Sequence, residues 1–273
     1  MTDPATKTHP VIFIHGLWIH SSAWQPWMHL FTERGYAVSA PGWPGDGDTV
    51  ADTRANPDAL NDTGIGEIVE HYAALIDSAH GKHEVKPIVV GHSFGGLIAQ
   101  ELLAAGEVAA AVAIDPAPIK GVKALPIAQL RSAFPVLGNP ANRHRTVSLN
   151  AKQFHYAFGN MLTEEESDDL HDKWTIPGPG KPLFEDATAN FSKHSPAKVD
   201  THLADRGPLL LTSGTEDHTV PLKVTKEVFG MYAKGQSDTE FHEFEGRGHS
   251  LTMDHGWRDV AEVALSWFAT NGF

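Results

Sequence analysis

Residues Val85–Gly96 read VKPIVVGHSFGG, and this stretch indicates the fold of the whole chain. Ile88, Val89 and Val90 form a short apolar, β-branched run, which is typical of a strand buried on both faces. A Gly-His-Ser-Phe-Gly turn follows at once, and after Gly96 apolar residues recur at helical spacing. The segment therefore predicts a strand, a sharp turn that carries Ser93, and a helix.

The turn has the pattern G-x-S-x-G, and its spacing has a physical reason. A serine on so sharp a turn has strained backbone angles, and side chains two residues before and after it would collide, so Gly91 and Gly95 remove them. The turn exposes the Ser93 hydroxyl above the sheet edge and puts the Phe94 N–H at a helix N-terminus, where it can stabilise an oxyanion. We expect His92 to pack beneath the serine. Because glycine and serine are common, the pattern alone is weak evidence for a catalytic serine. The rest of the chain must also supply a base, an acid and a second N–H donor.

Composition restricts the possible classes of protein. The 273 residues suffice for one large α/β domain with an insertion, or for two small domains. The net charge of −13 and the lack of any Lys/Arg cluster disfavour a nucleic-acid partner. Without cysteine the chain has no disulfide, no thiolate metal site and no cysteine nucleophile.

Targeting signals are not visible in the sequence. No apolar run approaches the roughly 20 residues that span a bilayer, so we expect no membrane partner. The opening MTDPATKTHP lacks the basic and apolar regions of a secretory signal. We expect residues 1–9 to form a loose tail and the protein to be cytoplasmic, which the absence of cysteine fits.

Strand and helix patterns alternate along most of the chain. Four predicted helices separate the apolar runs. They extend from Ser21 or Ser22 to Arg34, over 63–80, to about Lys234, and from a cap at Asp254. The predicted strands cover 11–14, 36–40, 88–90, 109–114, 208–213 and 240–244. Short connections between alternating elements predict an α/β fold with a mainly parallel sheet of about six strands and helices on both faces.

The alternation stops after the strand that ends at Asp115. Prolines recur from Ala117 to about Asp205, between short helical stretches such as 163–174, where Thr163 and Glu166 form a candidate capping box. We interpret 117–205 as a mostly helical cap inserted into one core domain, which comprises 1–116 and 206–273.

Polar residues follow several of these predicted strands directly. They are Ser93, Asp115, Asp217, His249 and the His15-Gly16 pair. Because the carboxyl ends of parallel strands meet at one edge of the sheet, these distant loops should converge on a single site.

With these residues in place, the chain resembles the α/β-hydrolases over residues 10–273. That family orders its residues as nucleophile, acid and histidine, and Ser93, Asp217 and His249 occur in that order. Gly214–Pro221 resembles the family's acid loop, and Gly248-His249 its histidine loop. His15-Gly16 resembles the oxyanion loop, so the resemblance implies the Leu17 N–H as a second donor beside that of Phe94.

Two departures from the family pattern narrow the choice. The family often begins with a hairpin before the His-Gly strand, whereas only nine residues precede it here. That short start resembles the branch of small esterases, methyl esterases and hydroxynitrile lyases. Serine at position 93 disfavours the haloalkane dehalogenases and epoxide hydrolases of this fold, which use aspartate there.

The expected roles follow from proton-transfer chemistry. A serine hydroxyl needs a base, and an imidazole suits both that step and the later protonation of the leaving group. We assign His249 as the base and Asp217 as the carboxylate that fixes its tautomer, with Asp115 and Glu216 as competing acids. The other histidines have no assigned role, including His218, His242 and His255. No zinc-binding pattern occurs, and we expect neither a metal nor another cofactor.

The predicted cap is rich in large apolar residues, which suggests an apolar pocket and a substrate with an apolar acyl or alcohol part. The candidate lining residues are Trp18, Phe134, Phe158, Met161 and Trp174. We expect a serine hydrolase acting on a small carboxylic ester through an acyl-enzyme. Thioesterase, lactonase, amidase and perhydrolase activities stay open, as do a carbon–carbon lyase, a slow-turnover ligand sensor of the same fold, and the oligomeric state.

Overall fold

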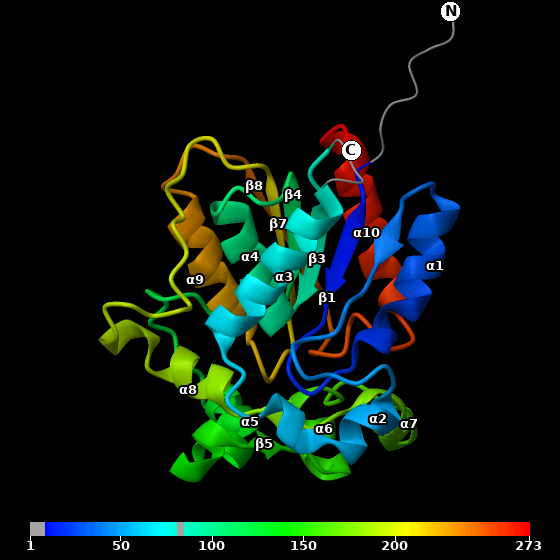
Figure 1. The fold of residues 1–273 in the computed structure, drawn as a ribbon, viewed down its shortest axis with the longest axis vertical. Coiled ribbons are helices and arrows are strands. Elements are labelled where there is room, and N and C mark those ends of the chain that lie inside the picture. Colours follow the sequence, from blue (N-terminus) through cyan, green and yellow to red (C-terminus); the bar gives the residue numbers. More distant parts are fainter. Residues whose placement is uncertain (1–8, 81–84) are drawn as a thin grey trace, which may run out of the picture.

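The computed structural model describes residues 9–80 and 85–273, which form a parallel sheet at the centre (Figure 1). The strands lie in the order β2-β1-β3-β4-β7-β8, and every pair is parallel. Their bounds are β1 Val11–Ile14, β2 Val38–Ser39, β3 Ile88–His92, β4 Ala110–Ile114, β7 Leu209–Gly214 and β8 Thr239–Phe244. The predicted mainly parallel sheet of six strands is confirmed, although β2 is shorter than the run from 36 to 40 suggested.

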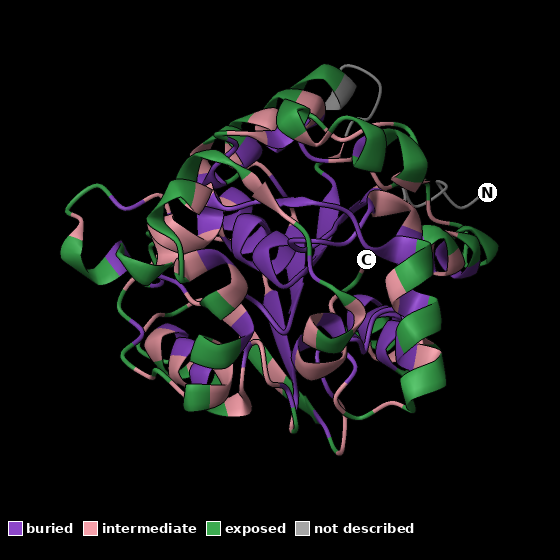
Figure 2. Ribbon diagram, turned by 90° about the horizontal axis from the view of Figure 1, so that it is seen from below, coloured by how far each residue is buried: buried purple, intermediate pink, exposed green. Residues whose placement is uncertain are grey.

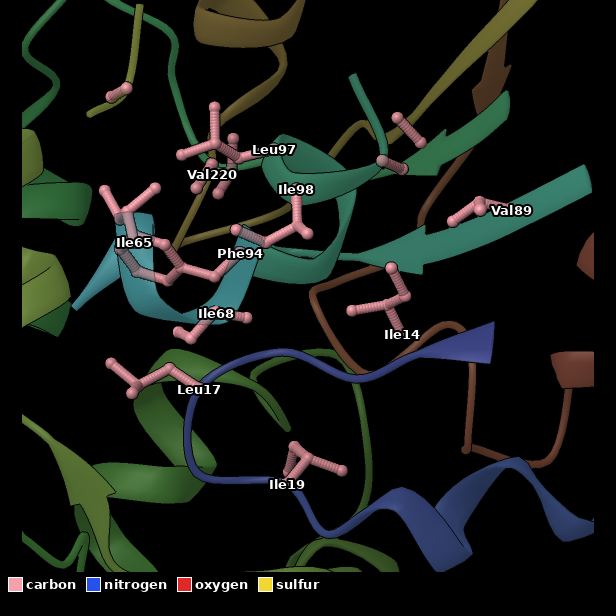
Figure 3. Packing of buried hydrophobic residues seen from close by; sticks show 14 of the residues in the cluster. Ile14, Leu17, Ile19, Ile65, Ile68, Val89, Phe94, Leu97, Ile98 and Val220 are labelled. Carbon is pink, nitrogen blue, oxygen red and sulfur yellow. The ribbon is translucent and has the colours of Figure 1, made fainter. Parts of the chain in front are cut away.

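Successive residues of each central strand enter different hydrophobic clusters. In β1, Ile12 and Ile14 belong to one cluster, whereas Val11 and Phe13 belong to the other. This alternation is the period of two that a strand imposes, and because both faces are covered, the strand reads as a continuous apolar run. Figure 3 shows the packing of the first cluster, with Ile14 and Val89 of the sheet beside Leu97 and Ile98 of the helix that follows Ser93.

Helices cover both faces of the sheet (Figure 1). One face carries α3 (Ile65–His80), α4 (Phe94–Ala104) and α9 (Leu222–Tyr232), and the other carries α1 (Gln25–Glu33) and α10 (Trp257–Thr270). In α3, the predicted helical spacing buries Ile65, Ile68, Tyr72 and Ile76. Each fully buried side chain of this size contributes about 1.5–3 kcal/mol, so the apolar stripe holds the helix on the sheet.

The segment between β4 and β7 lies with α2 (Val50–Ala55) beyond one end of the sheet, at the bottom of Figure 1. It contains α5 Ile127–Leu137, the 3₁₀ helix η3 Pro140–His144, β5 Thr146–Val147, α6 Ala151–Ala157, α7 Glu164–Trp174, β6 Gly178–Pro179, α8 Lys181–Ala187 and η4 Ala189–Phe191. The segment is mostly helical, as expected, but β5 and β6 also form a small antiparallel pair that the sequence did not suggest. The two remaining 3₁₀ turns, η1 Ser21–Trp24 and η2 Pro57–Leu60, precede α1 and follow α2. Figure 2 shows burial concentrated in the sheet and in the helix faces that contact it.

The start of the first predicted helix and two predicted helix caps differ from the structure. Ser21 and Ser22 lie in η1, whose N-cap is His20, and α1 begins only at Gln25. Asp254 does not cap α10 with its side chain, because its carboxylate pairs with Arg247 and the N-cap position is Gly256. Thr163 does cap α7, accepting from the Glu166 N–H at 3.2 Å. The Glu166 carboxylate, however, accepts from the His255 N–H at 2.8 Å instead of completing a capping box.

The terminal prediction is untested. Residues 1–8, which make up nearly all of the expected tail, lie outside the described residues. Among the residues that the structure describes, no helix has both the length and the apolar character needed to cross a membrane.

Candidate active site

Ser93 lies at the junction between β3 and α4 with φ 57° and ψ −120°, a conformation that is strained for a residue with a side chain. A Cβ atom on Gly91 would lie 2.0 Å from the Gly95 carbonyl oxygen, and one on Gly95 would lie 2.2 Å from the Ile14 carbonyl oxygen. The glycines therefore let the turn fold back on itself and pack against β1. Ser93 N–H donates to the Ile114 carbonyl at 2.9 Å, which ties the turn to β4 as well.

Replacing Gly95 with alanine should be strongly destabilising. The clashing atoms belong to the backbone of β1 and cannot move without distorting the sheet, so we expect a loss of about 3 kcal/mol or more of unfolding free energy. Gly66→Ala is the matched control, because a Cβ there meets nothing within 4 Å and α3 should gain about 0.5–1 kcal/mol. Urea denaturation measures both variants. Equal stability of Gly95→Ala and the wild type would contradict the close approach.

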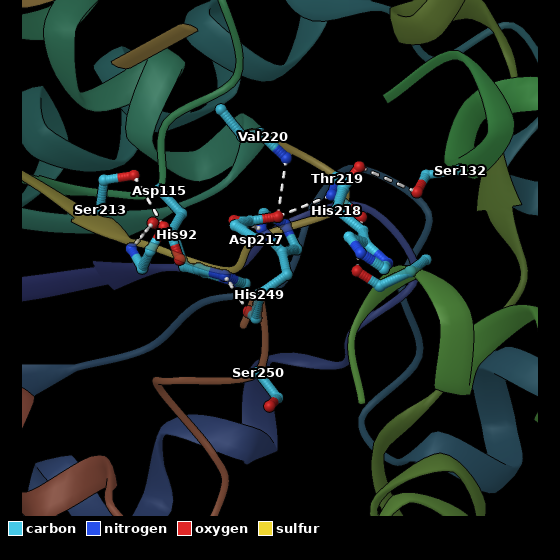
Figure 4. Close-up of polar contacts among 12 residues, drawn as sticks. His92, Asp115, Ser132, Ser213, Asp217, His218, Thr219, Val220, His249 and Ser250 are labelled. Atoms are coloured by element: carbon cyan, nitrogen blue, oxygen red, sulfur yellow. Dashed lines mark hydrogen bonds and ion pairs between the residues drawn. The ribbon is translucent and has the colours of Figure 1, made fainter. Parts of the chain in front are cut away.

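His249 and Asp217 form a hydrogen-bonded pair beyond the ends of the last two strands of the sheet (Figure 4). His249 Nδ1 lies 2.6 Å from Asp217 Oδ2, and both side chains are fully buried. The other oxygen, Asp217 Oδ1, accepts from the N–H groups of Thr219 at 2.6 Å and Val220 at 2.8 Å. The carboxylate is therefore held in place by its own loop and can fix His249 in the tautomer whose Nε2 is free to accept a proton.

His92, the residue before Ser93, connects the serine turn with the histidine loop. His92 Nε2 donates to the His249 carbonyl oxygen at 2.9 Å, and the two ring centroids are 4.6 Å apart. Burial, with a further contribution from His249, holds the pKa of His92 well below its usual value. His92 is thus a neutral donor beneath the site, in agreement with the packing role expected for it.

The Ser93–His249 contact is not closed in this structure. His249 Nε2 is buried and has no hydrogen-bond partner among the described residues, and Ser93 Oγ makes no hydrogen bond to it. Such contacts are often long without a substrate and tighten when it binds. The free Nε2 is the atom that a nucleophilic serine requires.

Asp115 lies beside Asp217 but does not bond to His249. Its side chain is fully buried, Oδ1 accepts from the Gly214 N–H at 2.7 Å, and Oδ2 has no hydrogen-bond partner in the described part of the chain. Burial raises the pKa of Asp115 well above its ordinary value, and the negative charge of Asp217 adds to that rise. Glu216, the other competing acid, is exposed. Of the three carboxylates, Asp217 alone is hydrogen-bonded to the imidazole.

Asp115→Asn should leave activity nearly unchanged. It should also make the protein more stable than the wild type, by an amount that is larger at high pH than at low pH. A folded-state pKa above the unfolded value means that the folded protein retains a proton that the unfolded chain releases, so wild-type stability falls as pH rises through this window. Asparagine keeps the Oδ1 acceptor for Gly214 and removes the proton linkage. Denaturant unfolding at about pH 5 and pH 8 should show a stabilisation that grows with pH. A pH-independent difference would mean that Asp115 is ionised in the folded protein.

His92, Asp115 and His249 each place one potential ligand atom within 4.8 Å of the others. The hydrogen bonds already described use His92 Nε2 and His249 Nδ1. These contacts account for the cluster as the floor of the site, so we assign no metal to it.

The loop after β1 brings a second N–H group to the site. Leu17 and Phe94 line the same cavity as Ser93, and within residues 9–80 and 85–273 neither backbone N–H has an acceptor. Trp18 has a positive φ of 69°, which shapes the loop, and a Cβ on Gly16 would lie 2.7 Å from Ser93 Cβ. Two unsatisfied N–H groups beside a serine are the arrangement that stabilises an oxyanion.

The cavity above Ser93 has a volume of about 220 Å³ and a mostly apolar wall. Its wall comes from the loops after β1, β3, β4 and β7 and from α5 and α8. The lining residues are Leu17, Trp18, Ser93, Phe94, Ala117, Pro118, Leu125, Gln129, Leu130, Ser132, Ala133, Leu137, Leu183, Asp186, Ala187, Thr219 and Val220.

Trp18 lies in this wall, but the other four predicted lining residues do not. Phe134 is 70% exposed and Met161 is 46% exposed, because both project outward from the segment over the site. Trp174 borders a separate, open cleft between α1, α7 and the start of α10. Phe158 packs its ring edge-on against His249, with centroids 4.8 Å apart, and so covers the histidine.

Four polar wall residues were not foreseen, namely Gln129, Ser132, Asp186 and Thr219. In α5, Gln129 precedes Ser132 and Ala133 by three and four positions, so these residues share one helix face. That spacing was a usable signal in the sequence. Asp186 had none, since one acidic residue in a short helix is most often solvated.

Comparisons with known proteins identify the family of this chain. The sequence profile of the alpha/beta hydrolase family matches residues 11–263. No curated protein matched the sequence.

Similar solved structures include a monoacylglycerol lipase of Paleococcus ferrophilus, with 23% identity, a TM-score of 0.66 and coverage of 97% of this chain and 96% of that one. An extracellular α/β-hydrolase of a Paenibacillus species has 21% identity and a TM-score of 0.65, covering 94% and 98%. A putative non-heme bromoperoxidase of Mycobacterium tuberculosis has 21% identity and a TM-score of 0.67, covering 96% and 92%. These similarities support the fold alone. From the profile match and the fold together, the chain belongs to the alpha/beta hydrolase family.

Proposed function

We propose that this hydrolase cleaves small carboxylic esters through an acyl-enzyme on Ser93. The observation that carries the proposal is the buried His249–Asp217 pair, in which His249 Nδ1 lies 2.6 Å from the carboxylate and His249 Nε2 is free. The backbone of His249 is hydrogen-bonded to His92, the residue next to Ser93. The apolar cavity that begins at Ser93 favours a substrate with an apolar acyl or alcohol part.

In the proposed mechanism, Ser93 Oγ attacks the ester carbonyl carbon while His249 Nε2 takes its proton. The Leu17 and Phe94 N–H groups bind the oxyanion of the tetrahedral intermediate. The carbon–oxygen bond to the alcohol then breaks, and His249 protonates the departing alkoxide. A water molecule attacks the acyl-enzyme with His249 again as base, which releases the acid and restores Ser93.

Some structural neighbours carry names of enzymes that act on esters, and these names are the reason for choosing an ester as the first substrate class to test. One of them is named a monoacylglycerol lipase and two are forms of polyneuridine aldehyde esterase, all with TM-scores of 0.65 or 0.66. They share the fold with this chain at 18–23% identity, so the substrate itself must be found by experiment.

Intact mass after incubation with a series of p-nitrophenyl esters tests the proposal, with nitrophenol release followed in parallel. We expect an acyl adduct that maps to Ser93 together with turnover. An adduct without turnover would favour a slow-turnover sensor of the same ligands over an enzyme. If neither an adduct nor nitrophenol release is observed, ester hydrolysis is rejected. Cleavage of mandelonitrile would then test the lyase alternative.

A further inference from the structure

One acidic side chain, Asp186, lies in the wall of the apolar cavity without a polar partner. Asp186, in α8, is half-buried and lines the wall between Leu183 and Ala187. Its carboxyl group has no hydrogen-bond or ion-pair partner among the described residues. Burial alone raises the pKa of Asp186 to about 8, so the group is mostly a neutral carboxylic acid at pH 7.

A second unpartnered polar group lies on the neighbouring helix. Gln129 Oε1, in α5, is buried and has no hydrogen-bond partner in the part of the chain that the structure describes. Gln129 lines the same cavity as Asp186, and α5 packs against α8. Ser132, on the same face of α5, is already satisfied, since its hydroxyl donates to the His218 carbonyl at 3.1 Å.

Unpaired polar atoms of this kind cost stability. An unsatisfied buried acceptor such as Gln129 Oε1 costs about 1–3 kcal/mol, and leucine at position 129 would remove that cost. Within residues 9–80 and 85–273, neither side chain bonds to another element, so no contact there recovers the cost. A ligand that bonds to both would recover it.

We propose that Asp186 and Gln129 form a polar subsite that binds a neutral hydroxyl group on the substrate, away from the ester that Ser93 attacks. A hydroxyl both donates and accepts, so it can donate to Gln129 Oε1 and accept from the protonated Asp186 carboxyl. The substrate class is then an ester with an apolar chain and a hydroxyl at a distance from the scissile bond. This inference rests on the proposed function.

An ammonium group fits the subsite less well. Binding it would require Asp186 to ionise in an apolar cavity, where desolvation disfavours the charged form. A hydroxyl leaves both partners neutral. Esters that carry an ω-amino group therefore serve as the competing probe.

The test compares matched esters on the intact protein. Methyl ω-hydroxyalkanoates from pentanoate to octanoate are paired with the unsubstituted esters and with the ω-amino esters of equal length. A second set places the same groups on the alcohol of acetate esters, so either end of the substrate can occupy the cavity. We expect kcat/KM for the best hydroxy ester to exceed that of its unsubstituted partner by about tenfold, as a satisfied buried hydrogen bond predicts.

Three variants separate the subsite from general effects. Asp186→Leu should abolish the preference for hydroxyl without lowering the melting temperature, because the carboxyl group has no partner among the described residues. Asp186→Asn should keep much of the preference, since an amide also donates and accepts. Asp168→Leu is the matched control on the exposed face of α7 and should leave the preference unchanged.

The outcomes separate this inference from the proposed function. If no methyl ester, acetate ester or nitrophenyl ester is hydrolysed, the proposed function fails. If plain esters are hydrolysed and wild type and Asp186→Leu show the same hydroxyl ratio, the subsite alone is rejected. A larger gain from the amino group than from the hydroxyl would also overturn the subsite as a neutral one. A lower melting temperature for Asp186→Leu would show that Asp186 has a structural role instead.

Discussion

Ser93→Ala should lower kcat/KM for esters by about 10⁴-fold or more while the fold stays intact. The variant removes the nucleophile but keeps the Leu17 and Phe94 N–H groups and the cavity, so substrate should still bind. Any residual rate would come from water attack on an ester held by those donors. Steady-state kinetics with the best nitrophenyl ester, and loss of the mass adduct, measure the effect.

The control for this variant is Ser250→Ala. Ser250 follows His249 and is equally buried, but its hydroxyl donates to Asp254 Oδ2 at 3.1 Å and does not line the cavity. Its replacement should change kcat/KM by no more than a few-fold. Full activity of Ser93→Ala would remove the serine from the reaction, and with it the acyl-enzyme.

Asp217→Asn should have the second largest effect, a fall in kcat of about 10⁴-fold. The amide oxygen can still accept from Thr219 and Val220, but the amide NH₂ then faces His249 Nδ1. That geometry favours the tautomer with its proton on Nε2, which cannot accept the serine proton. The measurement is kcat from pH-rate profiles of the variant beside the wild type.

Asp115→Asn serves as the comparison for Asp217→Asn. Both substitutions remove one carboxyl of the same buried pair, yet Asp217 alone bonds to the imidazole. A large loss in the Asp115 variant with a small loss in the Asp217 variant would reverse the assignment of the acid.

The positions of the candidate catalytic loops were predictable because they depend on local rules. The run Ile88–Val90 is apolar because the strand is buried on both faces, and Gly91 and Gly95 are required by contacts of 2.0 and 2.2 Å. Asp217 and His249 lie in the loops that follow β7 and β8, and parallel strands bring such loops to one edge. Position along the chain therefore indicates position in space.

The cavity wall was not predictable in the same way. An aromatic residue in α5 can face inward or outward, and the orientation depends on how that helix packs against its neighbours, which local sequence does not specify. Phe134 points outward whereas Gln129, an apparently ordinary surface residue, faces the cavity. The capping role of Asp254 failed for a similar reason, since the distant Arg247 competes for its carboxylate.

The residues proposed to react and those proposed to select the substrate lie in different parts of the chain, and this affects which substitutions the protein can accept. The groups proposed to react are held by contacts to the central strands, such as Gly95 against Ile14, where an added methyl group would lie 2.2 Å from a backbone oxygen. The side chains proposed to select the substrate, Asp186 and Gln129, lie on two helices between β4 and β7 and bond to no other residue that the structure describes. New selectivity can therefore arise by substitution in that segment with little penalty to folding, whereas the elbow and its neighbours are fixed by the sheet.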